Sequence, residues 1–395
     1  MRILVHDYSG HPFQVELSRE LARRGHSVTH SYSELYVSGK GHLVAQPGET
    51  ITFDSIGRGQ VAHKSFARRL VQEVTQGFEL ARHVRRVRPD VALMSNVQTA
   101  TLAVFAVFAV VFRIPWVLWH QDVYSIAVRS FAGAKLSRHY QLVAAGVEAG
   151  EKFASRRAAA VVAIADSFIP VHEGWGTADK VSVIPNWAPL DEIYPVDRKN
   201  DWAVEQQLDD TRTILYSGTL GLKHNPGLLV GLARRVIDRG QPVRLVVVNE
   251  GPAVELIRDE AARLDVPVTL LPFQPYERLP EVLGSGDLLV VLLDQTAGAF
   301  SVPSKTLSYL CAGRPVLGLM PAENLAAQLI DQVDGCVLPA LESSLDEAAD
   351  WTVELLGDAE RREELGAAAR RLAEAEFALQ GSADRFEAIL TRVAR

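Results

Sequence analysis

The sequence of 395 residues has little cysteine, and this limits two classes of site. Only Cys311 and Cys336 occur, each in an apolar stretch where a small buried thiol is the common state. Two such residues cannot supply the disulfide framework of a small secreted domain. The chain also has no group of His and Cys residues with zinc spacing. These features predict a reducing, cytoplasmic setting.

Long hydrophobic runs are also missing. The longest, "TATLAVFAVFAVVF", extends from Thr99 to Phe112, whereas a helix that crosses a bilayer needs roughly 20 apolar residues. We therefore expect a buried or interfacial helix there. The opening "MRILVHDYSG" becomes polar after five residues, so we expect no export signal.

Several catalytic motifs are absent. No pair of aspartates has D-x-D spacing, and no G-x-S-x-G elbow occurs. We therefore expect a mechanism that uses neither a bound metal nor a serine nucleophile. What is present is an ordinary globular composition, with 48% hydrophobic and 23% charged residues, long enough for two domains.

The net charge of −7 is unevenly divided between the two halves of the chain. Residues 1–180 carry 21 Lys and Arg against 15 Asp and Glu, whereas residues 181–395 carry 20 against 33. A basic first half and an acidic second half predict different binding partners for the two halves.

The positive surplus gathers in one stretch, from His63 to Asp90. Its basic residues are Lys64, Arg68, Arg69, Arg82, Arg85, Arg86 and Arg88. Two interpretations stay open, namely the solvated face of one long helix or a patch for anionic lipid headgroups. Nucleic acid is not expected as a partner, because aromatic residues are not interleaved and no known binding motif is present.

Each half opens with the same order of elements. Residues 1–28 predict a strand ending near Asp7, a loop through Gly10 and a helix that ends at Gly25. Residues 212–252 repeat this order, with a strand to Ser217, a glycine loop, and a helix that ends at Gly240. Further apolar strand candidates follow in "DVALMS", "PWVLWH", "AAVVAIA", "VTLLPF", "DLLVVLL" and "PVLGLM".

Strands that are almost continuously apolar and alternate with helices predict parallel sheets covered on both faces. The fold class is therefore α/β, with two doubly wound, Rossmann-like domains. We expect an amino-terminal domain at 1–190, a second domain at 210–375, and a helical segment at 376–395 that caps the second domain or packs back on the first. That last segment reads as two helices joined around Gly381.

In open parallel sheets, ligands bind beyond the carboxyl ends of the strands. His120 follows one such strand end and suits a hydrogen-bonding or proton-accepting role. In the second half, Gly218 and Lys223 lie in the loop "SGTLGLKHNP", which indicates either a phosphate site or a tight turn. Glu250, in the turn Asn249-Glu250-Gly251, could accept from a ribose or base, or could simply support a turn.

The stretch "VPSKTLSYLCAGRPV" predicts a short helix with an unusual start. Pro303 and Ser304 suit helix entry, and Gly313 suits the left-handed residue that ends a helix. We expect the amides near Ser304, Lys305 and Thr306, together with the Lys305 ammonium group, to bind a diphosphate.

Four segments together resemble the retaining glycosyltransferases of family 4, the group 1 transferases of GT-B fold. These are "YSGTLGLKHNPGLL", "NEGP", "VPSKTLSYLCAGRPVLG" and "IPNW". The resemblance is nearest to the branch that builds exopolysaccharide of the colanic-acid kind. It implies two domains that face each other across a cleft, the second binding a UDP- or GDP-linked sugar and the first a glycan or lipid-linked acceptor.

The resemblance also implies residue roles. Lys223 and Lys305 would neutralise the departing diphosphate without a metal or another cofactor, and His120 would contact the donor sugar. The donor would lie against residues that come from both domains. These are Gly10, Gly218, Thr219, Asn249, Glu250, Gly251, Val302, Pro303, Ser304, Thr306 and Ser308.

The sequence departs from the family at the two positions where glutamates are usual, which are Phe300 and Ser308 here. Thr219 stands where an arginine is common. Two alternatives to a transferase therefore stay open, a non-catalytic nucleotide-sugar-binding scaffold and a non-hydrolysing nucleotide-sugar epimerase. We expect a cytoplasmic protein, with peripheral attachment to the inner face of a membrane if the basic stretch binds lipid.

Overall fold

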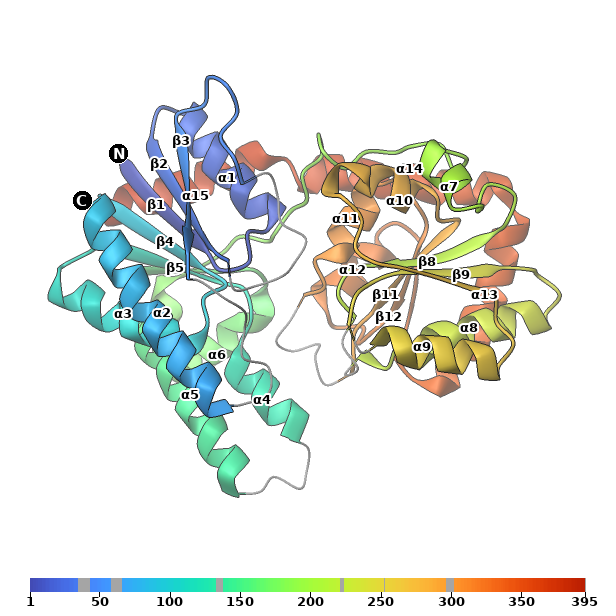
Figure 1. The fold of residues 1–395 in the computed structure, drawn as a ribbon, viewed down its shortest axis with the longest axis horizontal. Coiled ribbons are helices and arrows are strands. Elements are labelled where there is room, and N and C mark those ends of the chain that lie inside the picture. The colour runs from blue at the N-terminus through green and yellow to red at the C-terminus, as the bar shows by residue number, and fades with distance from the viewer. Residues whose placement is uncertain are drawn as a thin grey trace. The chain divides into compact units, whose positions relative to one another are not determined.

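The computed structural model describes residues 1–34, 43–57, 66–132, 138–220, 224–251, 253–295 and 302–394. These residues form two compact units (Figure 1). Unit 1 contains the chain up to Asn186 and again from Leu379 onward, and unit 2 contains the described residues from Trp187 to Ala378.

Unit 1 is built on a seven-stranded sheet with the order β3-β2-β1-β4-β5-β6-β7, in which all neighbouring strands are parallel. The strands are β1 (Arg2–Asp7), β2 (Ser27–Ser33), β3 (Ile51–Ile56), β4 (Val91–Ser95), β5 (Trp116–His120), β6 (Ala160–Ala163) and β7 (Val181–Val183). The central strands β4, β5 and β6 are buried at every position. Such full burial explains why their sequences are continuously apolar instead of alternating.

Helices connect these strands. They are α1 (Pro12–Arg23), α2 (Phe66–Val87), α3 (Thr99–Val111), α4 (Tyr124–Ala132), α5 (Arg138–Arg157) and α6 (Ile169–Trp175). The expected long basic helix is α2, and the apolar run from Thr99 is α3, which packs against α2. Their close approach depends on Gly77, where an added Cβ would lie 2.7 Å from the Val104 Cβ.

Unit 2 contains a six-stranded parallel sheet with the order β10-β9-β8-β11-β12-β13. The strands are β8 (Thr213–Ser217), β9 (Arg244–Val248), β10 (Val268–Leu271), β11 (Leu288–Leu292), β12 (Val316–Leu319) and β13 (Cys336–Leu338). Together with unit 1, this sheet confirms the predicted pair of doubly wound parallel sheets.

Helices cover both faces of the unit 2 sheet, with α8 and α9 on one side and α10 and α14 on the other (Figure 1). The helices of this unit are α7 (Asp201–Glu205), α8 (Gly227–Asp238), α9 (Ala253–Arg263), α10 (Leu279–Gly284), α11 (Lys305–Cys311), α12 (Leu325–Asp331), α13 (Leu345–Gly357) and α14 (Ala359–Glu376). As predicted, Gly240 follows α8 with φ 83° and Gly313 follows α11 with φ 62°. Both angles lie in the left-handed region that suits the end of a helix.

The last helix, α15 (Leu379–Ala394), belongs to unit 1, where it packs against α1, β4 and β5. The ring of Phe386 lies 4.5 Å from that of Trp119, and Arg24 forms an ion pair with Glu387 at 2.8 Å. The expected joint at Gly381 was wrong, because α14 and α15 meet at residues 377–378 and Gly381 lies inside α15. A glycine within a helix costs only about 1 kcal/mol, which the burial of Leu379 and Phe386 offsets.

Among the described helices, none is both long enough and apolar enough to span a bilayer.

Candidate active site

The carboxyl edge of the unit 2 sheet brings together most of the residues expected to bind a donor. Strands β9, β8 and β11 are neighbours in the sheet, so the loops that follow them meet at one edge. Gly218 and Thr219 follow β8, Asn249 to Gly251 follow β9, and Lys305 begins α11.

The loop after β8 is held in place from its neighbours. Gly218, at φ 126°, donates its N–H to the Val248 carbonyl oxygen at 3.0 Å. The Asn249 Oδ1 accepts from the Leu220 N–H at 3.0 Å. Asn249 is buried and thus ties the end of β9 to this loop. The positions 221–223, which include the predicted phosphate ligand Lys223, lie outside the described residues.

Lys305 contacts this loop through its ammonium group. Its Nζ donates to the Thr219 carbonyl oxygen at 3.2 Å and to the Tyr216 hydroxyl, and it lies 4.1 Å from the centroid of the Tyr216 ring. A Cβ added at Gly218 would lie 3.2 Å from the Lys305 Cε, so glycine allows the lysine stem to pass close to the loop. Burial lowers the pKa of Lys305 to about 7.

Tyr309, one turn further along α11, fixes the helix to the strand. Its hydroxyl accepts from the Ser217 N–H at 2.9 Å and donates to the Ser217 carbonyl oxygen at 3.1 Å. Burial raises the pKa of Tyr309, so the hydroxyl keeps the proton that it donates. The position of Lys305 therefore rests on a buried, doubly hydrogen-bonded anchor.

The start of α11 differs in detail from the expectation of free amides. The N–H of Thr306 donates to the Pro303 carbonyl oxygen, and the N–H of Leu307 donates to that of Ser304, both at 3.1 Å. Ser304 makes no side-chain capping bond, and Thr306 is fully buried. Val302, Pro303 and Ser308 are half-buried beside it. The Lys305 ammonium is thus the main cationic group that the described part of α11 offers to a ligand.

Glu250 lies in the turn after β9. This exposed residue accepts from the Phe273 N–H at 3.1 Å, so its carboxylate supports the neighbouring loop. Gly251 has φ 115°, an angle that favours glycine.

In unit 1, the corresponding carboxyl edge presents Gly10 and His120. Gly10 has φ 73° and lies in a loop that Asp7 stabilises, since the Asp7 carboxylate accepts from the N–H groups of Ser9 at 3.1 Å and His11 at 2.5 Å. His120 ends β5 next to β4.

His120 is buried among aromatic and imidazole rings. Its Nδ1 lies 3.1 Å from the His172 Nε2, and its ring is inclined by 30° to that of Trp175, with 6.0 Å between the centroids. Burial, with the neighbouring His172 as a second cause, lowers the pKa of His120 to about 3. At neutral pH His120 therefore presents an uncharged imidazole, suited to hydrogen bonding but not to pairing with a negative charge.

A small pocket beside His120 contains a carboxyl group that the sequence analysis did not identify. Glu151, on α5, accepts from the N–H groups of Tyr124 at 2.7 Å and Ser125 at 3.1 Å at the start of α4. Burial raises the pKa of Glu151 to about 7. No sequence signal marks it, because one glutamate in an amphipathic helix usually faces solvent. Tyr216 and Tyr309 were likewise missed, since an apolar strand and helix predict only core roles for aromatic residues.

Metal ligation finds no support in the residues that can be placed, because no three His, Cys, Asp or Glu side chains among them gather as a metal site would require.

The chain is similar to known proteins in sequence and in structure. The chain is 27% identical over 169 residues to the putative colanic acid biosynthesis glycosyl transferase WcaI of Escherichia coli K12, a match that spans 41% of each protein. Among solved structures, Anabaena Alr3699/HepE in complex with UDP and glucose superposes with a TM-score of 0.72 at 15% identity, covering 99% of this chain and 100% of that one. Sucrose-phosphate synthase from Thermosynechococcus elongatus gives 0.75 at 14% identity, with 100% and 99% covered.

Structural likeness at such low identity shows the fold alone. The family assignment rests on sequence, because residues 197–372 match the model of the family described as glycosyl transferases group 1. That segment contains the β8 loop, Asn249 and the whole of α11. The predicted resemblance to the group 1 glycosyl transferases is thereby confirmed for residues 197–372, the segment that matches the family model.

Proposed function

We propose that the protein transfers a sugar, with retention at the anomeric carbon, from a nucleoside-diphosphate sugar to a glycan or lipid-linked acceptor. The observation that carries this proposal is Lys305, held against the β8 loop within a segment of the glycosyltransferase family. Unit 2 would bind the donor, and unit 1 would supply the acceptor-binding groups. Synthesis of exopolysaccharide or another envelope glycan is the proposed setting, which the WcaI relative supports.

The donor diphosphate would be bound by an ammonium group next to a glycine-containing loop. Lys305 would supply a charge-assisted hydrogen bond to a phosphate oxygen, and Gly218 would let that oxygen approach the backbone. Lys223, from the same loop, is included in the proposal as a second cation. Electrostatic stabilisation of the leaving diphosphate by such groups is worth several kcal/mol in comparable sites, so the proposal includes no metal.

His120 would act through a neutral imidazole. An uncharged ring can hydrogen-bond a sugar hydroxyl without attracting the diphosphate away from unit 2. A UDP-linked donor is the first choice, because the similar HepE structures contain UDP, UDP-glucose, or UDP and glucose.

A transfer assay tests the function. The purified chain is incubated with UDP- and GDP-linked sugars and an oligosaccharide or lipid-linked acceptor, and the product is analysed by mass spectrometry and its anomeric configuration by NMR. We expect an α-linked product from an α-linked donor, and its loss in Lys305→Ala but not in Lys199→Ala, an exposed lysine paired with Asp210. Nucleotide binding without turnover would indicate a scaffold instead, and a changed sugar without acceptor would indicate an epimerase.

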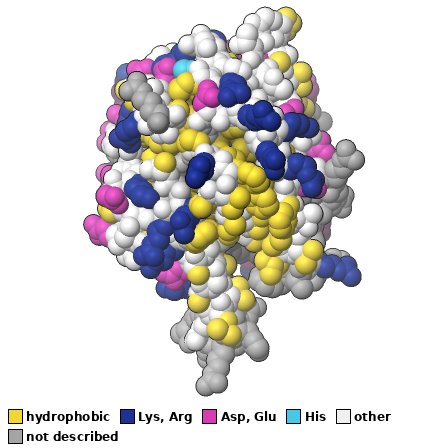
Figure 2. Space-filling view, turned by 90° about the vertical axis from the view of Figure 1, so that its left-hand side faces the viewer, with side chains coloured by type: hydrophobic (Ala, Val, Ile, Leu, Met, Phe, Trp, Pro, Cys, Tyr) yellow, Lys and Arg dark blue, Asp and Glu magenta, His cyan; other side chains and the backbone are white. Residues whose placement is uncertain are grey.

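We further propose that unit 1 attaches to anionic membrane surfaces through α2 and α3. Exposed apolar side chains gather on these helices, among them Val107, Val110, Val111 and Phe112 on α3 and its end and Phe78 on α2. Figure 2 shows a hydrophobic patch of this kind bordered by Lys and Arg side chains.

Arginines of α2 contribute to the basic border. Arg82, Arg85 and Arg86 are exposed on α2, and the Arg85 guanidinium lies 4.7 Å from the centroid of the Phe112 ring. An apolar centre with a cationic rim matches the boundary between acyl chains and anionic headgroups.

Co-sedimentation with phosphatidylglycerol–phosphatidylcholine vesicles tests this surface. We expect salt-sensitive binding that Arg82→Glu/Arg85→Glu/Arg86→Glu abolishes and that Val107→Asp/Val111→Asp weakens. The matched control reverses three exposed arginines of unit 2, Arg258, Arg263 and Arg361. Equal loss in this control, or no binding by the wild type, would refute the surface.

A further inference from the structure

The amino edge of the unit 2 sheet carries an arginine-lined pocket that the proposed transfer reaction does not use. Arg212 precedes β8, Asp287 precedes β11 and Arg314 precedes β12. Because these neighbouring strands are parallel, the three residues lie at the edge opposite the one where Lys305 meets the β8 loop. The pocket has a volume of about 750 Å³, which lies within the range of small-molecule sites.

Six arginines line this pocket, and fewer carboxylates balance them. The arginines are Arg198, Arg212, Arg314, Arg362, Arg370 and Arg371, and the acidic residues are Asp197, Asp287 and Glu363. A surplus of guanidinium groups in a concave site indicates an anionic ligand.

The Asp287 carboxylate already accepts several hydrogen bonds from the protein. This buried carboxylate accepts from Arg198 at 3.0 Å, from Arg212 at 2.8 Å and from the Thr213 N–H at 2.9 Å. Its hydrogen bonds are therefore shared between two arginines, and Arg370 pairs with Glu374 at 2.7 Å. Arg314 and Arg362 are thus pocket arginines that lie further from a carboxylate.

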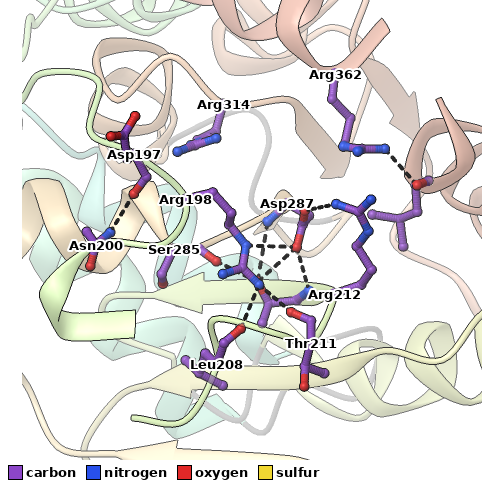
Figure 3. A network of polar contacts seen from close by, with 12 residues as sticks. Asp197, Arg198, Asn200, Leu208, Thr211, Arg212, Ser285, Asp287, Arg314 and Arg362 are labelled. Carbon is purple, nitrogen blue, oxygen red and sulfur yellow. Dashed lines mark hydrogen bonds and ion pairs between the residues drawn. The ribbon is translucent and has the colours of Figure 1, made fainter. Parts of the chain in front are cut away.

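Arg314 and Arg362 lie on one side of this cluster and reach it from different elements (Figure 3). Arg314 donates to the Val196 carbonyl oxygen at 2.5 Å, and Arg362 donates to those of Leu355 at 2.8 Å and Leu356 at 2.6 Å. Within the described ranges neither guanidinium forms an ion pair at 4.0 Å or less, although Asp287 attracts both from a greater distance. Burial lowers the pKa of both residues, as expected for charges removed from water without full compensation.

Two further nitrogens in the pocket lack hydrogen-bond acceptors. The Arg198 Nη1 and the Arg314 Nε are buried, and no acceptor for either is found in the part of the chain that the structure describes. A buried donor without a partner costs about 1–3 kcal/mol, and more when it is charged. An anion seated between these arginines would remove that cost.

The wall of the pocket is tightly packed. A Cβ added at Gly366 of α14 would lie 2.4 Å from the Gly313 carbonyl oxygen, so helix and loop touch through their backbones. Such packing holds the arginines of α14 at a set distance from those before the strands, and preorganised charge binds an anion more strongly.

We propose that this pocket binds a condensed phosphate, such as pyrophosphate or the phosphate chain of a nucleotide. Guanidinium forks bind phosphate oxygens in pairs, and a condensed phosphate presents several charges to arginines that come from different elements. A ligand with a single carboxylate group would neutralise only one of these arginines. The site is separate from the donor site and does not depend on the proposed transfer.

Calorimetric titration of the full chain with sodium pyrophosphate tests the proposal. To keep the donor site out of the signal, the titrations are made in the Lys305→Ala background. We expect binding that weakens at least tenfold in Arg362→Gln and in Arg371→Gln, the latter an exposed residue whose change should not disturb the fold. Arg361→Gln is the matched control, since Arg361 neighbours Arg362 on α14 but does not line the pocket.

The outcomes separate the alternatives. Absence of binding, or equal affinity in Arg362→Gln, Arg371→Gln and Arg361→Gln, would overturn the site. A second titration with a nucleoside triphosphate distinguishes the two sources of phosphate: equal affinity supports recognition of the phosphate chain alone, and tighter binding supports a nucleotide. Transfer activity is measured separately in Arg371→Gln with Lys305 intact. Retained transfer there, together with weakened pyrophosphate binding by Arg371→Gln in the Lys305→Ala background, would show that this site and the donor site are independent.

Discussion

At the scale of single residues, the proposed donor site of unit 2 depends mainly on Lys305. A lysine with an ordinary pKa stays charged at neutral pH whether or not a ligand is bound. Burial lowers the pKa of Lys305 to about 7. The side chain is then readily neutral when the site is empty, and a bound diphosphate would favour its charged form. Charge at this site is thereby coupled to the presence of ligand.

This coupling predicts a pH dependence of nucleotide affinity. Below about pH 7 the free protein already carries the Lys305 proton, whereas above it binding must take up a proton. We expect the Kd for UDP to rise by up to about tenfold per pH unit above pH 7, measured by calorimetry between pH 6 and 9. Lys305→Arg keeps its charge, so its affinity should stay flat; the same slope in both proteins would contradict this assignment.

Sequence motifs could find Lys305, Gly218 and His120 because each follows a strand or begins a helix in a recognisable pattern. They could not find Glu151, whose importance comes from burial against the start of α4, 26 or 27 residues away along the chain. Nor could they show that Tyr309 anchors Ser217, since a buried tyrosine in an apolar helix looks like core. Such roles depend on contacts between distant elements, which local patterns do not record.

At the scale of elements, the central strands were predicted because they are buried on both faces. Strands β3, β7 and β13 were not predicted individually. They are short or mix polar and apolar residues, and β7 and β13 are only half-buried. The apolar run of α3 was recognised as a helix too short to span a bilayer, but only the structure shows that several of its valines are exposed.

Two helix glycines, one at the contact between α2 and α3 and one in an open position of α5, should respond in opposite ways to substitution by alanine. Gly77→Ala places a methyl group 2.7 Å from the Val104 Cβ and 3.0 Å from the Thr101 carbonyl oxygen, so we expect a loss of about 1–3 kcal/mol in the free energy of unfolding. Gly146→Ala, in the interior of α5, meets no atom within 4 Å and should gain roughly 0.5–1 kcal/mol from helix propensity. Urea unfolding measures both, and a neutral Gly77→Ala would show that the helices can separate without cost.

At the scale of the whole molecule, the chain returns to its first unit at the end. The helix α15 completes the packing around Trp119 with a fully buried Phe386. The sequence left open whether the last segment packs on the first or the second domain, because amphipathic helices do not identify the surface that they cover. Contacts between residues some 270 positions apart settle this only in three dimensions.

Truncation of that contact should therefore destabilise unit 1 selectively. Phe386→Ala leaves a cavity beside Trp119 and should cost about 3–5 kcal/mol, seen in differential scanning calorimetry as an earlier transition for unit 1 and an unchanged one for unit 2. The exposed Arg392→Ala on the same helix serves as control. Equal shifts of both transitions would mean that the units do not unfold separately.

The uneven division of charge also belongs to this scale. The second half of the chain is acidic, yet its sheet presents Lys305 at the carboxyl edge and a group of arginines at the amino edge. The central claim is that the carboxyl edge of the unit 2 sheet binds a nucleoside diphosphate through Lys305. Calorimetric titration with UDP and with uridine, on the wild type, Lys305→Ala and Lys199→Ala, tests it most directly. We predict that UDP binds far more tightly than uridine and that only Lys305→Ala weakens UDP binding, by about 10- to 100-fold; UDP affinity that is unchanged in Lys305→Ala, or no stronger than that of uridine, would contradict the account.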